Sequence, residues 1–169
     1  MFTLRRLSAA ALAGGALGSL VADSTALAVS SGILYYRQYN MNNNVVVNGC
    51  RSTDTVAYGS SLIIGLSNTW TFGGSAGSCS SSKAVPAGYL YSFTYLFANG
   101  SLCSSAAATN SASSNLQSTT TNCARVTGYP YYTTGYHGWY KGQNCQPSDY
   151  CSNGYSFDGT GLNSPVLTG

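Results

Sequence analysis

Residues 89–100 read YLYSFTYLFANG, and this stretch decides the fold that the sequence predicts. Aromatic side chains occupy every second position of the run: Tyr89, Tyr91, Phe93, Tyr95 and Phe97. Alternate side chains of a strand lie on one face, whereas a helix would scatter these rings around its axis. We therefore expect a β-strand whose aromatic face belongs to the core, followed by a hairpin turn at Asn99-Gly100.

The same alternation marks residues 61–72, which precede the aromatic run. The larger apolar side chains of this segment share one face: Leu62, Ile64, Leu66, Trp70 and Phe72. A period of two predicts a strand with that face buried. Residues 33–41 and 45–47 are also rich in β-branched and aromatic residues, which favour strands, and Asn48-Gly49 predicts a second hairpin turn.

The remaining segments carry weaker strand signals. Residues 106–121 are small and polar, which favours a long surface loop or a weak strand. Residues 129–140 read YPYYTTGYHGWY and predict two short strands joined by a turn at residues 133–135. No repeat of fixed period and no linker divides the chain. The prediction is a single all-β domain, a disulfide-braced, β-sandwich-like fold with antiparallel strands in Greek-key or meander order.

The N-terminal residues have the pattern of a secretory signal peptide. Arg5 and Arg6 precede a run of Ala, Gly and Leu, and Ala26-Leu27-Ala28 is a small-x-small cleavage signature. We expect residues 1–28 to be removed and residues 29–169 to form a single secreted domain. No later segment is long and apolar enough to predict a membrane-spanning helix, so we expect no membrane span.

The cysteines indicate the same compartment. An even number of cysteines in an exported chain predicts a disulfide framework, here of three bridges. The spacing does not choose among the pairings, apart from a preference for one small loop between the last two cysteines. No Cys-x-x-Cys or paired-His spacing is present, so a zinc site is not expected. The residues assigned to disulfides are Cys50, Cys79, Cys103, Cys123, Cys145 and Cys151.

Charge is scarce, and its scarcity excludes several function classes. Lys and Arg number 7, Asp and Glu 4, and the net charge is +3, too little for the clustered cations that nucleic-acid binding needs. His137 is the single His, no Glu is present, and no Gly-x-Ser-x-Gly elbow occurs. Asp149 and Asp158 fit surface turns better than a glycosidase pair. We expect no catalytic site, no metal and no cofactor.

The strongest functional signal is the density of aromatic residues near residue 135. Tyr and Trp combine apolar area with a polar tip, and they dominate binding hot spots. Gly, Pro, Thr and Lys interrupt this segment, which favours an exposed surface that binds an extracellular carbohydrate or protein surface. The candidate ligand-binding residues are Tyr129, Tyr131, Tyr132, Tyr136, His137, Trp139, Tyr140 and Lys141.

Two other functions fit the same features. Low charge weakens repulsion between copies, and strand-rich segments can add edge to edge, so the chain could be an assembly subunit of an extracellular coat, filament or secreted complex. Small disulfide-rich folds also serve as secreted toxins or inhibitors. The expected function is therefore a secreted, non-enzymatic binding protein, with self-associating structural subunit and toxin or inhibitor as the alternatives.

Overall fold

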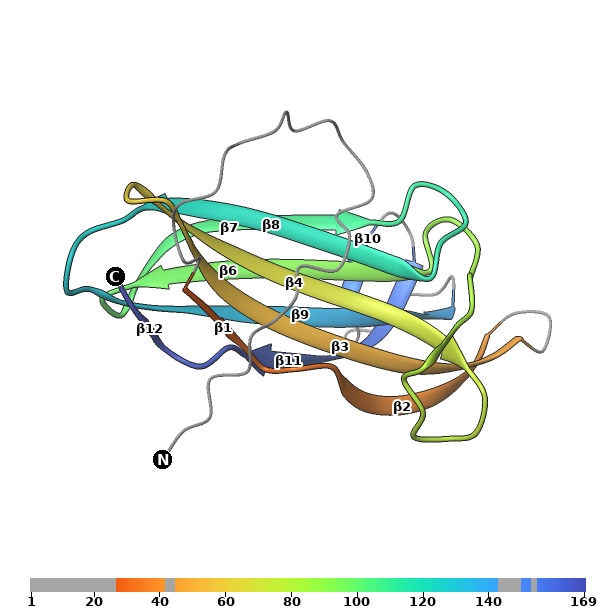
Figure 1. The fold of residues 1–169 in the computed structure, drawn as a ribbon. Coiled ribbons are helices and arrows are strands. Elements are labelled where there is room, and N and C mark those ends of the chain that lie inside the picture. The colour runs from red at the N-terminus through yellow and green to blue at the C-terminus, as the bar shows by residue number, and fades with distance from the viewer. Residues whose placement is uncertain (1–26, 42–44, 143–149, 153–154) are drawn as a thin grey trace.

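The computed structural model describes residues 27–41, 45–142, 150–152 and 155–169 (Figure 1). Every regular element in these residues is a strand, which confirms the all-β prediction, and they include no helix long and apolar enough to cross a membrane. The strands are β1 (Ala28–Ser30), β2 (Leu34–Met41), β3 (Val45–Tyr58), β4 (Leu62–Gly73), β5 (Ser81–Ser82), β6 (Leu90–Ala98), β7 (Ser101–Thr109), β8 (Leu116–Ala124), β9 (Pro130–Gly142), β10 (Tyr150–Ser152), β11 (Tyr155–Asn163) and β12 (Leu167–Thr168).

The strands form two antiparallel sheets that lie face to face (Figure 1). In the first sheet β3 pairs with β1, β2 and β4, and β4 also pairs with β5 and β8. The second sheet has the order β10-β11-β9-β6-β7, with β12 beside β9. The β2-β3-β4 segment is a meander, and the chain then alternates between sheets at β6, β8 and β9. The sandwich-like prediction is confirmed.

One of the predicted turns is present, and the others are not. Asn99-Gly100 joins β6 to β7 with φ values of 47° and 78°, as a tight hairpin requires. The predicted turn at Asn48-Gly49 is wrong because β3 continues through both residues. Glycine is needed there for close packing, since a Cβ on Gly49 would lie 2.7 Å from the Trp139 ring. The turn at 133–135 is also wrong, since β9 is one continuous strand. Residues 106–121 are not one long loop, because their two ends belong to strands β7 and β8 and only a short connection lies between these strands.

The faces of β4 and β6 that point to the other sheet are the reverse of those expected, although Tyr91 and Phe72 are buried as predicted. Ser92 Oγ of β6 donates to the Ser67 carbonyl at 2.9 Å, and Thr94 Oγ1 donates to the Thr119 carbonyl at 3.0 Å, both in the opposite sheet. The face of β6 with Ser92, Thr94 and the two leucines therefore points inward, and its aromatic residues point outward. Tyr91 on this outer side is still buried, with its ring centroid 5.5 Å from that of Phe157. In β4, likewise, Ser67 is buried while Leu66 beside it is half exposed. Hydrogen bonds between the sheets make this polar interior stable.

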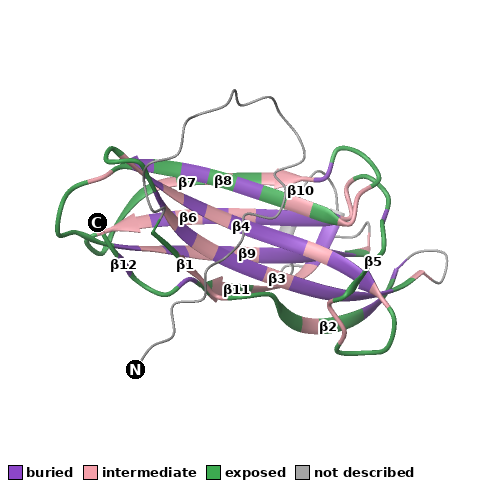
Figure 2. Cartoon of the chain, viewed as in Figure 1, coloured by how far each residue is buried: buried purple, intermediate pink, exposed green. Residues whose placement is uncertain are grey.

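The core has apolar ends and a polar middle, and buried and exposed residues alternate along its strands (Figure 2). One apolar cluster contains Tyr39, Met41, Val47, Val85, Leu90 and Trp139. The other contains Ala57, Ile63, Leu96, Cys123, Tyr131 and Leu167. Buried polar side chains fill the space between them: Thr53, Thr55, Ser67, Thr69, Ser92, Thr94, Thr119, Thr133 and His137.

Two disulfides brace the described residues. Cys50 of β3 bonds to Cys79 in the loop after β4, and Cys103 of β7 bonds to Cys123 of β8, which links the two sheets. Such bridges are typical of oxidising compartments. A third predicted bridge would involve Cys145, which lies outside the described residues, so the expected Cys145–Cys151 pairing stays a prediction. The expected leader also lies outside them up to residue 26.

Candidate functional site

The candidate binding residues of β9 do not form one exposed cluster. Because β9 is a single strand, its side chains alternate between the interior and the outer face of the second sheet. Tyr131, His137 and Trp139 point inward and are fully buried, and Tyr140 is only 5% exposed. The expectation that these four side chains are exposed is therefore wrong, although Tyr140 still lines a pocket described below. The partly or fully exposed candidates are Tyr129, Tyr132, Tyr136 and Lys141.

His137 belongs to the polar middle of the core. Thr69 Oγ1 donates to the Tyr91 carbonyl at 2.9 Å, which leaves this hydroxyl to accept from His137 Nδ1 at 3.2 Å. His137 Nε2 then accepts from Thr53 Oγ1 at 3.0 Å. Burial, reinforced by the charge of Arg51, lowers the pKa of His137 to about 3, so the ring is neutral. The His is a structural link between the sheets.

Trp139 and Tyr131 anchor the two apolar clusters. The Trp139 ring stacks on both Tyr36 and Tyr39, with ring-centroid distances of 5.7 and 5.3 Å, and its Nε1 donates to the Trp70 carbonyl at 2.9 Å. The Tyr131 hydroxyl accepts from the Val126 amide and donates to the Ala124 carbonyl. Both side chains are saturated with internal contacts, which explains why aromatic density on β9 misled the sequence prediction.

An aromatic surface does exist, but it is centred on β6. We use the term aromatic face for five half-buried aromatic residues on the outer side of the second sheet: Phe93, Tyr95, Phe97, Tyr132 and Tyr136. The ring centroids of Phe93 and Tyr95 lie 4.1 Å apart, and those of Tyr95 and Phe97 lie 6.5 Å apart. Phe97 stacks on Tyr132 with a centroid distance of 4.8 Å. Four of the rings therefore form a contiguous row along β6 and across to β9, and Tyr136 is the cross-strand neighbour of Phe93.

The surroundings of the aromatic face are small and uncharged. Ala107 and Ser105 of β7 stand beside Phe93 and Tyr95 in register, and Thr134 stands beside Tyr95 on the β9 side. Strands β6 and β7 and residues 130–140 of β9 contain no Asp, Lys or Arg. The alternation of residues 89–97 could be recognised from the sequence. Which face of this strand points inward could not, because the residues that bond to its inner face lie on other strands.

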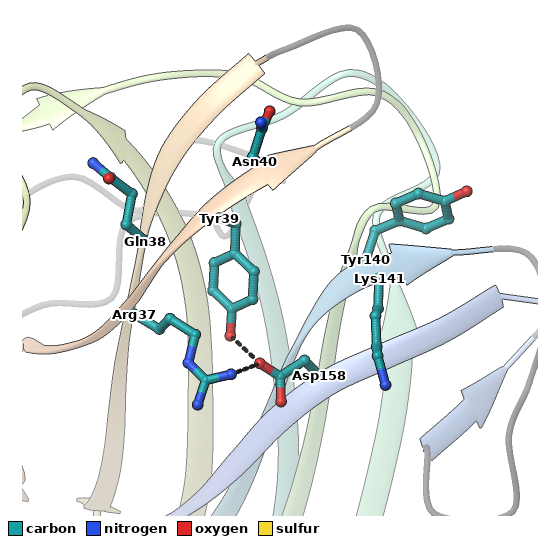
Figure 3. Close-up of a pocket in the computed structure, with 7 residues that line it drawn as sticks. All are labelled: Arg37, Gln38, Tyr39, Asn40, Tyr140, Lys141 and Asp158. Carbon is teal, nitrogen blue, oxygen red and sulfur yellow. Dashed lines mark hydrogen bonds and ion pairs between the residues drawn. The ribbon is translucent and has the colours of Figure 1, made fainter.

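A separate pocket of about 310 Å³ opens at the edge of the sandwich, between β2 and the second sheet (Figure 3). Two of the sequence candidates, Tyr140 and Lys141, contribute to it. Tyr140 also stacks on Tyr89, with ring centroids 4.2 Å apart, so the pocket adjoins the tyrosine that directly precedes β6. The lining residues are Arg37, Gln38, Tyr39, Asn40, Tyr140, Lys141 and Asp158.

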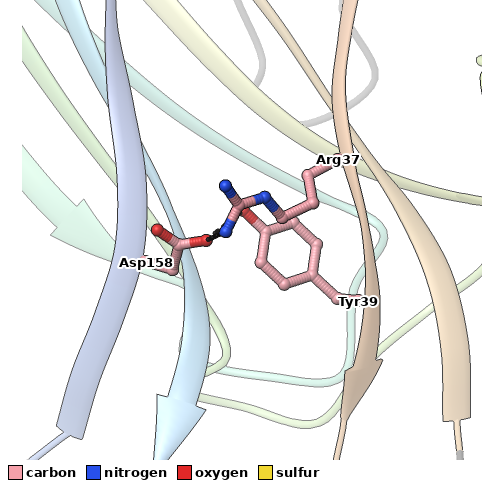
Figure 4. A network of polar contacts seen from close by, with 3 residues as sticks. All are labelled: Arg37, Tyr39 and Asp158. Atoms are coloured by element: carbon pink, nitrogen blue, oxygen red, sulfur yellow. Dashed lines mark hydrogen bonds and ion pairs between the residues drawn. The ribbon is translucent and has the colours of Figure 1, made fainter.

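Asp158 collects the polar contacts of this pocket (Figure 4). Arg37 Nη1 lies 2.8 Å from Asp158 Oδ2, and the Tyr39 hydroxyl donates to the same oxygen at 3.3 Å. Burial, followed by the charge of Asp158, raises the pKa of Tyr39, which therefore stays protonated. Since Arg37 and Tyr39 lie in β2 and Asp158 in β11, these contacts join the two sheets at their edge.

The described residues contain no group of three or more His, Cys, Asp or Glu side chains that could hold a metal ion. The comparisons with known proteins gave no matching family model, no matching curated protein and no matching solved structure. The geometry of the chain itself is therefore the basis for a functional proposal.

Proposed function

We propose that this protein is a secreted, non-enzymatic binding protein that recognises a neutral carbohydrate through the aromatic face. The observation that carries the proposal is the continuous row of half-buried rings on an uncharged sheet surface. Aromatic rings present apolar area to the C–H faces of sugars, and tyrosine hydroxyls add hydrogen bonds at the ring tips. Such a surface is rigid because its residues belong to strands.

The absence of charge on this surface selects among ligand classes. Nucleic acids and acidic polysaccharides are bound through Lys and Arg, and the strand segments that carry the aromatic face have neither. A protein partner would contact the same rings, and the experiment below distinguishes it from a carbohydrate. The leader-like N-terminus and the two disulfides support secretion as part of the proposal.

The test is binding of the disulfide-bonded protein, residues 29–169, to a panel of insoluble and soluble neutral polysaccharides. The variant is Tyr95→Ala combined with Phe97→Ala, and we expect binding about tenfold or more weaker, because hot-spot aromatic residues carry most of the energy of an interface. Tyr58→Ala is the matched control, since Tyr58 is a 49% exposed tyrosine of the first sheet.

The outcomes are separable. Retention on a polysaccharide that is lost in the double variant and kept in Tyr58→Ala supports the proposal, provided that thermal unfolding shows both variants folded. Equal retention by the double variant, or no retention of the unaltered protein on any member of the panel, overturns it. A dimer in sedimentation that the double variant abolishes, without polysaccharide binding, assigns the aromatic face to self-association instead.

A further inference from the structure

The outer face of the first sheet carries a groove of about 540 Å³ that the proposed function does not use. Thr53 and Thr55 of β3 point inward to His137 and Thr133. Asp54, which lies between them, therefore points to this outer face. Asp54 and Leu66 are cross-strand neighbours there, as are Ser52 and Asn68. The floor and walls of the groove include Ile33, Ser52, Asp54, Leu66, Asn68 and Trp70.

A chain of hydrogen bonds crosses the floor and ends on a carboxylate. Ser118 Oγ donates to Asn68 Oδ1 at 2.6 Å, and Asn68 Nδ2 donates to Ser52 Oγ at 3.2 Å. Ser52 Oγ in turn donates to Asp54 Oδ2 at 3.4 Å. The other carboxylate oxygen, Asp54 Oδ1, is buried and has no hydrogen-bond partner. Each donor of the chain is directed toward Asp54, which leaves one oxygen of this groove-lining carboxylate without a donor.

Asp54 is also without a counter-ion. It is the single charged side chain that lines the groove. Among the described residues the ion pair joins Arg37 to Asp158, and no cation lies within ion-pair distance of Asp54. Burial raises the pKa of Asp54, against the effect of hydrogen bonds from Ser30 and Ser52. Buried charges in proteins are normally paired, so this carboxylate is complemented best by a cation.

We propose that this groove binds a primary amine with an apolar body, whose ammonium group pairs with the Asp54 carboxylate while the body contacts the apolar lining, which includes Leu66, Ile33 and Trp70. The ammonium group supplies both the missing positive charge and the missing donor, whereas an alcohol supplies a donor alone. The inference is independent of carbohydrate binding, because the aromatic face lies on the other sheet.

The probe is 2-phenylethylamine, compared with the uncharged 2-phenylethanol, titrated into the disulfide-bonded protein at pH 7 and followed by chemical shifts of Ser52, Asn68 and Trp70. We expect the amine to bind at least about tenfold more tightly than the alcohol, since a hydrogen bond to a charged group is worth more than a neutral one. Asp54→Asn should bring amine binding down to the level of the alcohol. Asp158→Asn is the matched control and should leave amine binding unchanged.

A second variant tests the same site without removing the carboxylate. Leu66→Lys places an ammonium group beside Asp54 in cross-strand register, and we expect it to occupy the site and block the amine. Equal binding of amine and alcohol, amine binding unchanged in Asp54→Asn, or no amine binding to the folded protein would each overturn the proposal. Loss of polysaccharide binding in the aromatic-face variant would not affect these outcomes.

Discussion

Phe97 of β6 and Tyr132 of β9 stack face to face, with ring centroids 4.8 Å apart and an interplanar angle of 5°. The two residues are direct cross-strand neighbours on the outer side of the second sheet. Both rings are half-buried, so each shields part of the other from water while remaining accessible at the surface. The stack therefore serves both the stability of the sheet and the shape of the aromatic face.

The first prediction concerns the strength of this stack. Aromatic pairs are worth about 0.5–1.5 kcal/mol beyond their area burial. A double-mutant cycle of Phe97→Ala and Tyr132→Ala should give a coupling of this size in urea denaturation. A cycle of Phe97→Ala with Tyr129→Ala is the control and should give none, because Tyr129 lies outside the row of stacked rings. Additive effects of Phe97 and Tyr132 would show that the stack contributes nothing to stability.

The second prediction concerns the tight packing at Gly135. A Cβ at this position would lie 2.6 Å from both His137 Nε2 and Ser67 Oγ, and it would also overlap Thr53. Gly135→Ala should therefore lower the free energy of unfolding by about 1–3 kcal/mol, as overpacking does in cores. Gly142→Ala, in the same strand, has no atom within 4 Å of the new Cβ and should change stability little. Equal effects of the two substitutions would contradict the close approach of the sheets at Gly135.

The third prediction is a pH dependence due to His137. Its pKa is about 3 in the folded protein, against an ordinary value of about 6.5 in the unfolded chain. Between these pH values the unfolded chain binds a proton that the folded protein excludes, so stability falls as the pH falls from 6.5 toward 3. Urea denaturation at pH 4 and pH 7 should show this slope, and His137→Gln should remove most of it. An unchanged slope in His137→Gln would assign the pH dependence to other groups.

The fourth prediction concerns the cost of burying Asp54. Because its pKa is raised on folding, the folded protein holds the proton to higher pH than the unfolded chain does, and stability from this group falls as the pH rises. Asp54→Asn removes the buried charge and should stabilise the protein at pH 7, with little gain at pH 3. Denaturation midpoints at the two pH values measure the difference. Destabilisation at pH 7 would mean that the carboxylate is already compensated.

The strand prediction for residues 89–97 was correct because it depends on a local period of two, which β6 follows. The prediction that its aromatic face points into the core was wrong, because the inward face of a strand depends on the residues of the opposite sheet. The sequence of β6 does not show that Ser92 and Thr94 find the carbonyls of Ser67 and Thr119 in the opposite sheet. Hydrophobicity alone favours aromatic residues inside, and here the hydrogen bonds between sheets outweigh it.

The errors at Gly49 and Gly135 have a common cause. Glycine next to Asn or Thr predicts a turn, but it equally permits close approach of another side chain, and one sequence does not separate the two uses. Phe93, Tyr95 and Phe97 were missed as candidates because a regular aromatic strand resembles a core strand. Asp54 was missed because its importance depends on the hydrogen-bond chain from Ser118, which begins on a different strand.

The polar middle of the sandwich has a thermal consequence. Exposing apolar surface raises the heat capacity of unfolding, whereas exposing polar surface lowers it. Unfolding this protein exposes many hydroxyl groups of the core, such as those of Thr53, Thr94 and Thr133. Its heat capacity change per residue should therefore fall below the usual range of about 12–15 cal/mol/K. The curve of stability against temperature is then broad and shallow, so that cooling and warming by the same interval alter the folded fraction only gradually.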